Sequence, residues 1–194
     1  MTFTESALSF TFAPEYWELI AYDRHKYYNA VKGAGLRGVD FLGIWKEDKL
    51  VLLEIKNFQL REAAQSGPAI LELLENPDLL FDAMIEKKQD SLLALDGIEA
   101  YLRRRWLYRR MEPHFHKLPT PWQGRLPWAF WAKILACRTN LCTVLWLETE
   151  PSYDGWEAHR VQKFRQDLQQ KLKKYDILLA GNGVNPFGHT LLVK

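Results

Sequence analysis

Long apolar runs are missing from the sequence, in which no stretch approaches the roughly 20 apolar residues that cross a bilayer as a helix. The segment from Met1 to Phe12 also lacks a basic start followed by an apolar run, which is the pattern of a secretory signal peptide. We therefore expect a soluble, cytoplasmic protein with no membrane partner.

Cysteine is scarce, since Cys137 and Cys142 are the two cysteines in 194 residues. They do not have CxxC spacing and no second pair exists, which argues against a zinc site. We interpret them as buried thiols in a reducing compartment. The sequence also has no GxxxxGK[ST] phosphate loop and no internal repeat, which excludes P-loop NTPases and repeat architectures.

Net charge is small, at +2, so the overall charge does not indicate a nucleic-acid-binding protein. Such a signal has to come from local clusters of arginine and lysine. The hydrophobic fraction of 47% and the aromatic fraction of 13% indicate a folded, globular chain. Its length fits a single domain over residues 1–194 with a sizeable core.

The most informative stretch covers residues 38–56, where two apolar segments are joined by a polar turn at Lys46 to Lys49. This pattern predicts a β-hairpin. Asp40 begins the first strand, and the second ends Leu-Leu-Glu-Ile-Lys, so Glu54 and Lys56 share one side of it. Buried charges are costly unless they are paired or bind a metal. Two carboxylates and a lysine at adjoining strand ends therefore indicate a divalent-cation site, the alternative being an ordinary hairpin with charged ends.

This arrangement resembles the PD-(D/E)xK nuclease superfamily, which has the restriction-endonuclease-like fold. The matching residues are Val39-Asp40 and Glu54-Ile55-Lys56, with Val39 where the family name has proline. The resemblance implies that Asp40, Glu54 and the Ile55 carbonyl bind Mg²⁺ (or Mn²⁺). It also implies that Lys56 helps to position the attacking water and stabilises charge, as expected of a Mg²⁺-dependent nuclease.

Hairpin geometry sets a condition on this site. A two-residue turn at Glu47-Asp48 would place Asp40 opposite Ile55, so that Asp40 and Glu54 would face apart. We therefore expect a three-residue loop, a bulge near Gly43, or splayed strand ends.

A first helix is predicted from Pro14 to about Val31, because Pro14 and Glu15 suit a first turn and apolar residues follow at helical spacing. Asp23 lies within the apolar face of this helix. In many members of the superfamily the first helix adds an acidic metal ligand, so the resemblance points to Asp23, then to Glu15 and Glu18. The alternative for Asp23 is a hydrogen bond to a tyrosine or an ion pair with a neighbour.

Basic and aromatic residues are interleaved from Tyr101 to Arg125. Because arginine forks bind phosphates and aromatic faces stack on bases, this segment is the best candidate for contact with nucleic acid. The predicted contacts are Arg103, Arg104, Arg105, Trp106, Arg109 and Arg110. The alternative is a solvated helix face followed by a proline-rich loop.

Elsewhere, Leu8–Phe12 reads as a short strand or extended arm, and residues 68–110 as a helical insertion with a break at residues 76–78. Further predicted elements are a helix at 127–137, a strand at 141–147, a helix at 159–175 and strands at 176–180 and 190–193. This order indicates an α/β fold with a restriction-endonuclease-like mixed sheet flanked by helices.

Two functions are consistent with these patterns. The first is a metal-dependent nuclease that hydrolyses phosphodiester bonds, with DNA preferred over RNA. The second is a catalytically silent, nuclease-derived subunit of a larger complex, which binds nucleic acid or protein. A homodimer or a larger nucleoprotein complex, endonuclease or exonuclease action, and the form of the substrate all stay open.

Overall fold

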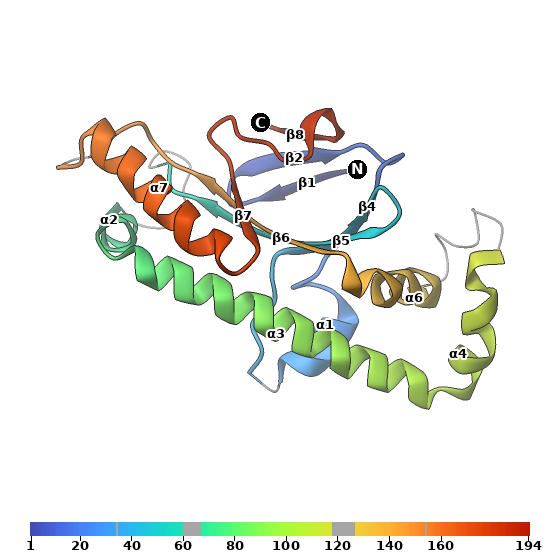
Figure 1. Cartoon of the computed structure of the whole chain (residues 1–194). Helices are drawn as coiled ribbons and strands as arrows, with labels where there is room; N and C mark the ends of the chain where they lie inside the picture. Colours follow the sequence, from blue (N-terminus) through green and yellow to red (C-terminus); the bar gives the residue numbers. More distant parts are fainter. Residues whose placement is uncertain (34, 60–66, 118–126, 154) are drawn as a thin grey trace. The chain divides into compact units, whose positions relative to one another are not determined.

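The computed structural model describes residues 1–33, 35–59, 67–117, 127–153 and 155–194 (Figure 1). Its contacts divide the chain into two compact units. Unit 1 comprises Met1–Tyr16, Leu53–Glu86 and Cys142–Lys194, and unit 2 comprises Trp17–Leu52 and Lys87–Leu141. Strand β5 (Lys49–Asn57) and helix α3 (Pro77–Arg104) therefore each have residues in both units.

The described strands form two sheets. The first has the order β1-β2-β8, with antiparallel neighbours, and is built from β1 (Thr2–Glu5), β2 (Leu8–Phe12) and β8 (Leu191–Val193). The second has the order β3-β4-β5-β6-β7, and its other strands are β3 (Trp17–Ala21), β4 (Phe41–Trp45), β6 (Leu141–Glu148) and β7 (Ile177–Ala180). Because β3 and β4 are antiparallel while β6 and β7 are parallel, this sheet is mixed. The α/β class with a mixed sheet and flanking helices is confirmed, and the restriction-endonuclease-like topology stays a prediction.

Unit 1 is organised by helix α7 (Ala158–Lys173), which Figure 1 shows beside β7. The helix buries one face at helical spacing, made of Val161, Phe164, Leu168 and Leu172. Leu145 and Leu147 of β6 belong to the same apolar cluster. Helix α2 (Gly67–Glu75) and the first part of α3 complete this core with Ile70, Leu74, Leu80 and Met84.

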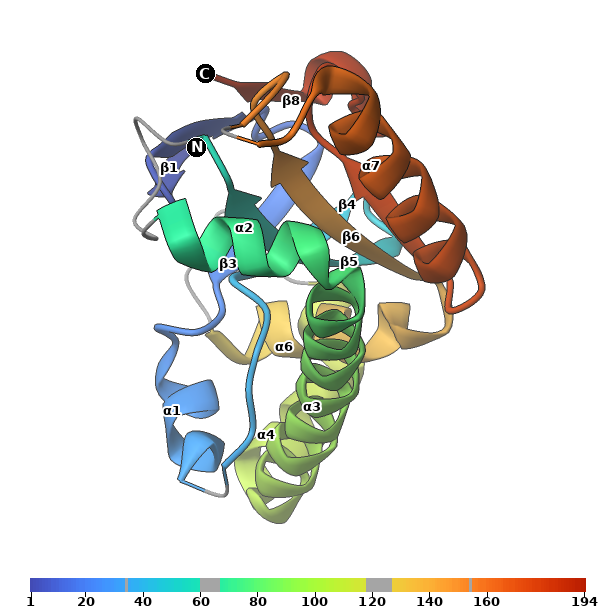
Figure 2. The same cartoon turned by 90° about the vertical axis from the view of Figure 1, so that its left-hand side faces the viewer.

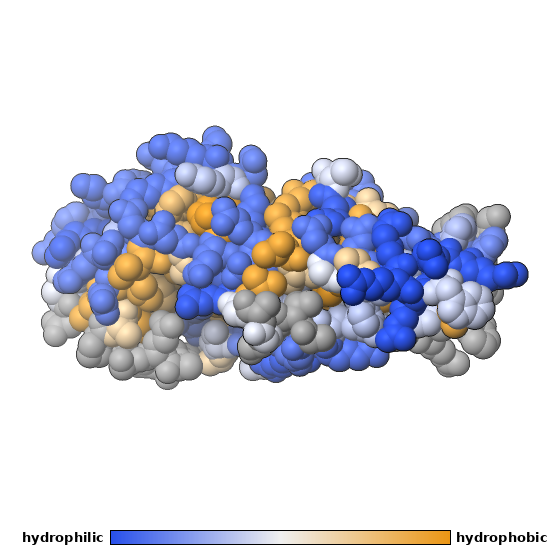
Figure 3. All heavy atoms as spheres, turned by 90° about the horizontal axis from the view of Figure 1, so that it is seen from below, coloured by the Kyte–Doolittle hydropathy of each residue, from blue (hydrophilic) through white to orange (hydrophobic). Residues whose placement is uncertain are grey.

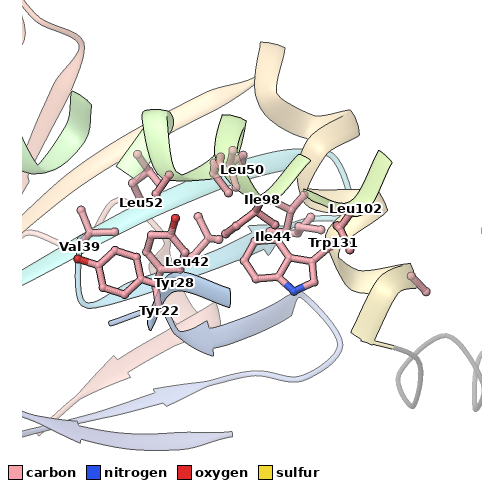
Figure 4. Close-up of a cluster of buried hydrophobic side chains, with 14 of the residues drawn as sticks. Tyr22, Tyr28, Val39, Leu42, Ile44, Leu50, Leu52, Ile98, Leu102 and Trp131 are labelled. Carbon is pink, nitrogen blue, oxygen red and sulfur yellow. The ribbon is translucent and has the colours of Figure 1, made fainter. Parts of the chain in front are cut away.

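Unit 2 has a second core, shown in Figure 4, in which Tyr22, Ile44, Ile98 and Trp131 come together from strands and helices. Its remaining elements are α1 (Lys26–Lys32), α4 (Trp106–Met111), η1 (Glu112–Lys117), α6 (Pro127–Ala136) and η2 (Cys137–Thr139). Figure 2 shows the segment between α1 and β4 running beside α3. The backbone N–H groups of Arg37 and Val39 donate to Asp90 and Ser91 of that helix, at 2.8 and 3.0 Å.

The long first helix predicted from Pro14 to Val31 is wrong. Residues 17–21 form β3, which pairs with β4, and the helix α1 covers only Lys26–Lys32. Buried Trp17 and Leu19 alternate with the less buried Glu18 and Ile20, which is the period of a strand. Pairing with β4 therefore decides the structure of a segment whose apolar residues also have helical spacing.

Most other predicted elements are confirmed within a few residues at each end. The helical segment after residue 67 is interrupted at Asn76, between α2 and α3, as predicted. The predicted strands at 8–12, 141–147, 176–180 and 190–193 correspond to β2, β6, β7 and β8. Among the described helices, none combines the length and apolar composition needed to cross a membrane.

Candidate active site

The clearest feature of unit 1 is a carboxylate beside an amine at the end of β5. The Nζ atom of Lys56 lies 3.0 Å from Oε1 of Glu54. The side chain of Glu54 is only 2% exposed, whereas that of Lys56 is 28% exposed. Glu54 and Lys56 are two residues apart on a strand, so their side chains point to the same face of the sheet, as expected from the alternation of side chains along a strand. The carboxylate is therefore held inside the protein, while the amine reaches solvent.

The burial of Glu54 follows from the position of β5 within its sheet. Residues 50–53 and Ile55 are all 1% exposed or less, as in a strand covered on both faces. The N–H of Phe58 donates to the carbonyl of Glu148 at 2.8 Å, so the pairing continues one residue beyond β5. A carboxylate in such a strand needs a compensating charge. Lys56 supplies it.

Asp40 lies in unit 2, immediately before β4, and its side chain is half-buried. Its backbone carbonyl accepts a hydrogen bond from the N–H of Tyr22 at 2.8 Å. The preceding Gly38 donates its N–H to the hydroxyl of Tyr28, and a Cβ at Gly38 would lie 2.8 Å from that ring. Glycine at 38 thus allows the tyrosine to approach, and the backbone leading to Asp40 is fixed.

The hairpin loop consists of Lys46, Glu47 and Asp48, the three residues between β4 and β5. Of the three arrangements expected from hairpin geometry, the structure has the three-residue loop. Lys46 and Glu47 have φ values of 52° and 69°, a left-handed conformation that costs on the order of 1 kcal/mol for a residue other than glycine. On its other side, Gly43 pairs with Leu19 in an unbroken β3–β4 register.

The acidic candidates assigned to a first helix do not lie on one. Asp23 lies between β3 and α1, and its Oδ1 is 3.8 Å from Nε of Arg24, which agrees with the alternative of an ion pair with a neighbour. Glu18 is a β3 residue whose Oε1 accepts a hydrogen bond from Nζ of Lys133 at 2.5 Å. Glu15 is exposed in the turn before β3. None of the three acids therefore has the position on a first helix that the resemblance implied.

The donor types of the remaining residues fit a hard divalent cation. Within the part of the chain that the structure describes, no three His, Cys, Asp or Glu side chains gather closely enough to hold a metal ion. The ligand set implied by the family resemblance needs only two such side chains, Asp40 and Glu54, with the Ile55 carbonyl as third donor. Carboxylate and carbonyl oxygens are the ligands that Mg²⁺ and Mn²⁺ prefer.

The predicted nucleic-acid contacts lie in unit 2, at the end of α3 and in α4. All six side chains are exposed, and Trp106 is 66% exposed. Arg103 pairs with Glu99 one turn earlier, with 2.8 Å between Nε and Oε1. No ion pair joins Arg104, Arg109 or Arg110 to a carboxylate of the described residues. Figure 3 shows strongly hydrophilic atoms at the side of the view where Figure 1 has α4.

A pocket of about 350 Å³ adjoins these arginines in unit 2. Its lining comprises Tyr27, Tyr101, Arg105, Trp106, Leu107 and Trp128. The basic, aromatic segment from Tyr101 onward contains Tyr101, Arg105, Trp106 and Leu107, but the pattern did not point to Tyr27 or Trp128, because these two come from separate segments. One available signal was the spacing of Tyr101 and Arg105, which are four residues apart. Residues 118–126 of the predicted basic segment lie outside the described residues.

Buried Tyr108 stands between the exposed arginines and packs with Phe115, their ring centroids being 5.8 Å apart. Burial, with the nearby carboxylate of Glu112, raises the pKa of Tyr108 to about 12. The tyrosine therefore anchors α4 to the core of unit 2 as a neutral group, and the neighbouring arginines are left facing solvent.

Comparisons with protein-family models, with curated proteins and with solved structures found no match to this chain.

Proposed function

We propose that this chain is a metal-dependent nuclease that hydrolyses phosphodiester bonds, with DNA as the expected substrate. The observation that carries the proposal is the pair of Glu54 and Lys56 at the end of β5, with 3.0 Å between Oε1 and Nζ. A buried carboxylate and a solvent-reaching lysine at this spacing match the second half of the D…ExK pattern. Asp40 supplies the first half, just before the neighbouring strand of the hairpin.

The hydrogen-bonding pattern of the hairpin supports a pairing of Asp40 with Glu54. The N–H of Leu50 donates to Asn140 at 3.0 Å, on the β6 side, so odd-numbered residues of β5 bond toward β4. The Asp40 carbonyl bonds toward β3, so odd-numbered residues of β4 bond toward β5. A three-residue loop, with Trp45 across from Lys49, satisfies both conditions.

If the hairpin continued unbroken from Trp45 and Lys49, Asp40 would come opposite Glu54 in the count. Such a pair would be of the non-hydrogen-bonded type, in which opposed side chains are closest and share a face. A two-residue loop would instead join odd-numbered residues to even-numbered ones, contrary to the observed bonds. The loop length thus favours one site for both carboxylates.

Each residue of the proposed site has a separate task. The carboxylates of Asp40 and Glu54 and the Ile55 carbonyl would hold the Mg²⁺ or Mn²⁺ ion. When bound, the ion supplies charge stabilisation at the phosphoryl oxygen and a water of lowered pKa. Lys56 extends to solvent from its ion pair with Glu54, where its ammonium can offset negative charge that develops on the phosphate.

Cleavage assays test this proposal. A panel of linear, supercoiled, single-stranded and branched DNA, together with RNA, would be incubated with Mg²⁺, Mn²⁺ or EDTA. We expect metal-dependent cutting that falls by roughly 10²–10³-fold in Lys56→Ala and in Asp40→Ala. Lys49→Ala is the matched control, because Lys49 begins the same strand. Wild-type cutting by Lys56→Ala would contradict the mechanism.

A catalytically silent binding module predicts a different result. Such a module would cut none of the substrates, and calorimetry would detect no Mn²⁺ binding. Tight Mn²⁺ binding without cutting would instead point to a missing partner subunit.

A further inference from the structure

The pocket of unit 2 has aromatic walls that come from four separate elements. Tyr27 belongs to α1, Tyr101 to α3, Trp106 to α4 and Trp128 to α6. The rings of Tyr27 and Tyr101 lie 5.9 Å apart at an angle of 51°. Nε1 of Trp128 donates to the hydroxyl of Tyr27 at 3.2 Å. The walls therefore hold one another in place before any ligand arrives.

One wall of the pocket is positively charged. The Nη2 atom of Arg105 donates to the hydroxyl of Tyr101 at 2.7 Å, and its Cζ lies 5.0 Å from the centre of that ring. Aromatic pockets of this size also suit quaternary ammonium groups. Here the guanidinium would repel such a cation, so the charge favours a ligand that combines a flat ring with negative charge.

The surroundings point to the same chemistry. Trp106 and Tyr101 are 66% and 44% exposed, so ring surface is open to a stacking partner. Arg104, Arg109 and Arg110 are exposed nearby and form no ion pair with a carboxylate among residues that the structure describes. Flat bases flanked by phosphates fit both features, because aromatic side chains stack on bases and arginines contact the strand backbone.

We infer that this pocket binds an unpaired base, and that the chain prefers single-stranded segments of nucleic acid. The inference rests on the proposed function for the class of ligand, and it narrows that class to strands whose bases are accessible. A volume of about 350 Å³ lies at the lower end of the range for ligand pockets. A base paired within a duplex cannot enter without leaving its stack, which is energetically costly.

Binding in EDTA tests the inference without any contribution from cleavage. Fluorescence anisotropy would follow a short labelled DNA strand, the same sequence as a duplex, and the corresponding RNA strand. We expect the DNA or the RNA single strand to bind at least about tenfold more tightly than the duplex. Trp106→Ala should weaken single-strand binding by about tenfold or more, because stacking on one base is worth this much. Trp106→Phe should retain most of the affinity.

Trp156→Ala is the matched control, because Trp156 also has an arginine over its ring, with Arg160 Cζ at 4.3 Å, but lies in unit 1. We expect this variant to bind like the wild type. Equal affinity for strand and duplex would overturn the inference, as would single-strand binding by Trp106→Ala within about twofold of wild type. Comparison of the DNA and RNA strands identifies the sugar of the preferred ligand. If single strands bind as expected but no substrate is cut with Mg²⁺ or Mn²⁺, catalysis by this chain alone fails and the pocket assignment stands.

Discussion

The two regions with candidate functional charges hold those charges in opposite ways. At the end of β5, Glu54 is 2% exposed and lies against Lys56. At the end of α3 and in α4, the arginines are exposed beside an open tryptophan. A buried charge lowers stability unless it is compensated, whereas an exposed arginine costs almost nothing. The single buried pair is therefore stronger support for a specific chemical role than the larger group of exposed arginines.

The largest expected effect on stability comes from breaking the buried pair. Lys56→Met removes the amine and leaves the charge of Glu54 buried without it. We expect the free energy of unfolding to fall by about 3 kcal/mol. Arg103→Met breaks the exposed pair with Glu99 and should cost less than about 1 kcal/mol. Urea denaturation of the two variants and the wild type measures both values.

A second substitution shows whether the loss arises from the buried charge of the Glu54 carboxylate. Glu54→Gln in the Lys56→Met background removes the remaining charge and should recover much of the stability, without any recovery of cleavage. Equal losses in Lys56→Met and Arg103→Met would remove the contrast between the buried and the exposed region.

The sequence predicted the hairpin because its signals are local, but local signals did not decide everything. Alternation along the second strand placed Glu54 and Lys56 on one face, and the polar turn marked the connection. The sequence left open whether the hairpin has a three-residue loop, a bulge near Gly43 or splayed strand ends. It did not mark the loop, because Lys46 and Glu47 adopt positive φ without the glycine or asparagine that usually indicates this conformation. The hydrogen bonds of Asp40 to Tyr22 and of Leu50 to Asn140 show which residues of the two strands bond away from the hairpin, and the sequence does not contain this information.

The N-terminal segment shows where local reasoning fails. Tyr16, Leu19 and Ile20 have helical spacing, while Trp17 and Leu19 have strand spacing, so short windows support both structures. The pairing of residues 17–21 with 41–45 decides for the strand, and no local pattern contains that information. The aromatic pocket was unpredictable for the same reason, because its walls are brought together from three separated segments, around Tyr27, residues 101–107 and Trp128.

A smaller effect is expected at a glycine in the strand that leads from Asp40. A Cβ at Gly43 would lie 2.6 Å from Cδ1 of Leu19 and 2.8 Å from the carbonyl oxygen of Glu18 in β3. Because the backbone oxygen cannot turn away, Gly43→Ala has to displace β3 from β4. We expect a loss of about 2 kcal/mol in the free energy of unfolding.

Gly33→Ala is the exposed counterpart, since a Cβ built at Gly33 would meet no atom of the described residues within 4 Å, its chain neighbours aside. This substitution should change the free energy of unfolding by less than about 0.5 kcal/mol. Urea denaturation separates the two cases. A tolerated alanine at position 43 would show that β3 and β4 can move apart at that position, and would weaken the register argument for Asp40 and Glu54.

The smallest effect is expected at Tyr153, a buried neighbour of the β5 end. Its hydroxyl accepts a hydrogen bond from the N–H of Glu150 at 2.9 Å and donates to the carbonyl of Phe58 at 3.0 Å, two residues after Lys56. Burial raises the pKa of Tyr153 to about 12, from about 10 in the unfolded chain. The folded state thus favours the neutral hydroxyl. Its contribution to stability is complete below pH 10 and is lost as the pH rises from 10 to 12.

Tyr153→Phe separates the hydrogen bonds from the titration. At neutral pH the variant should lose about 1 kcal/mol, the usual net value of such a hydrogen bond. Between pH 10 and 12 its stability should fall less steeply than that of the wild type, because one buried hydroxyl no longer titrates. Urea denaturation at closely spaced pH values gives both slopes. Identical slopes would mean that Tyr153 ionises as easily in the folded as in the unfolded chain, and that the end of β5 is open to water. In that case the contrast between the buried end of β5 and the exposed arginines at the end of α3 and in α4 would not hold.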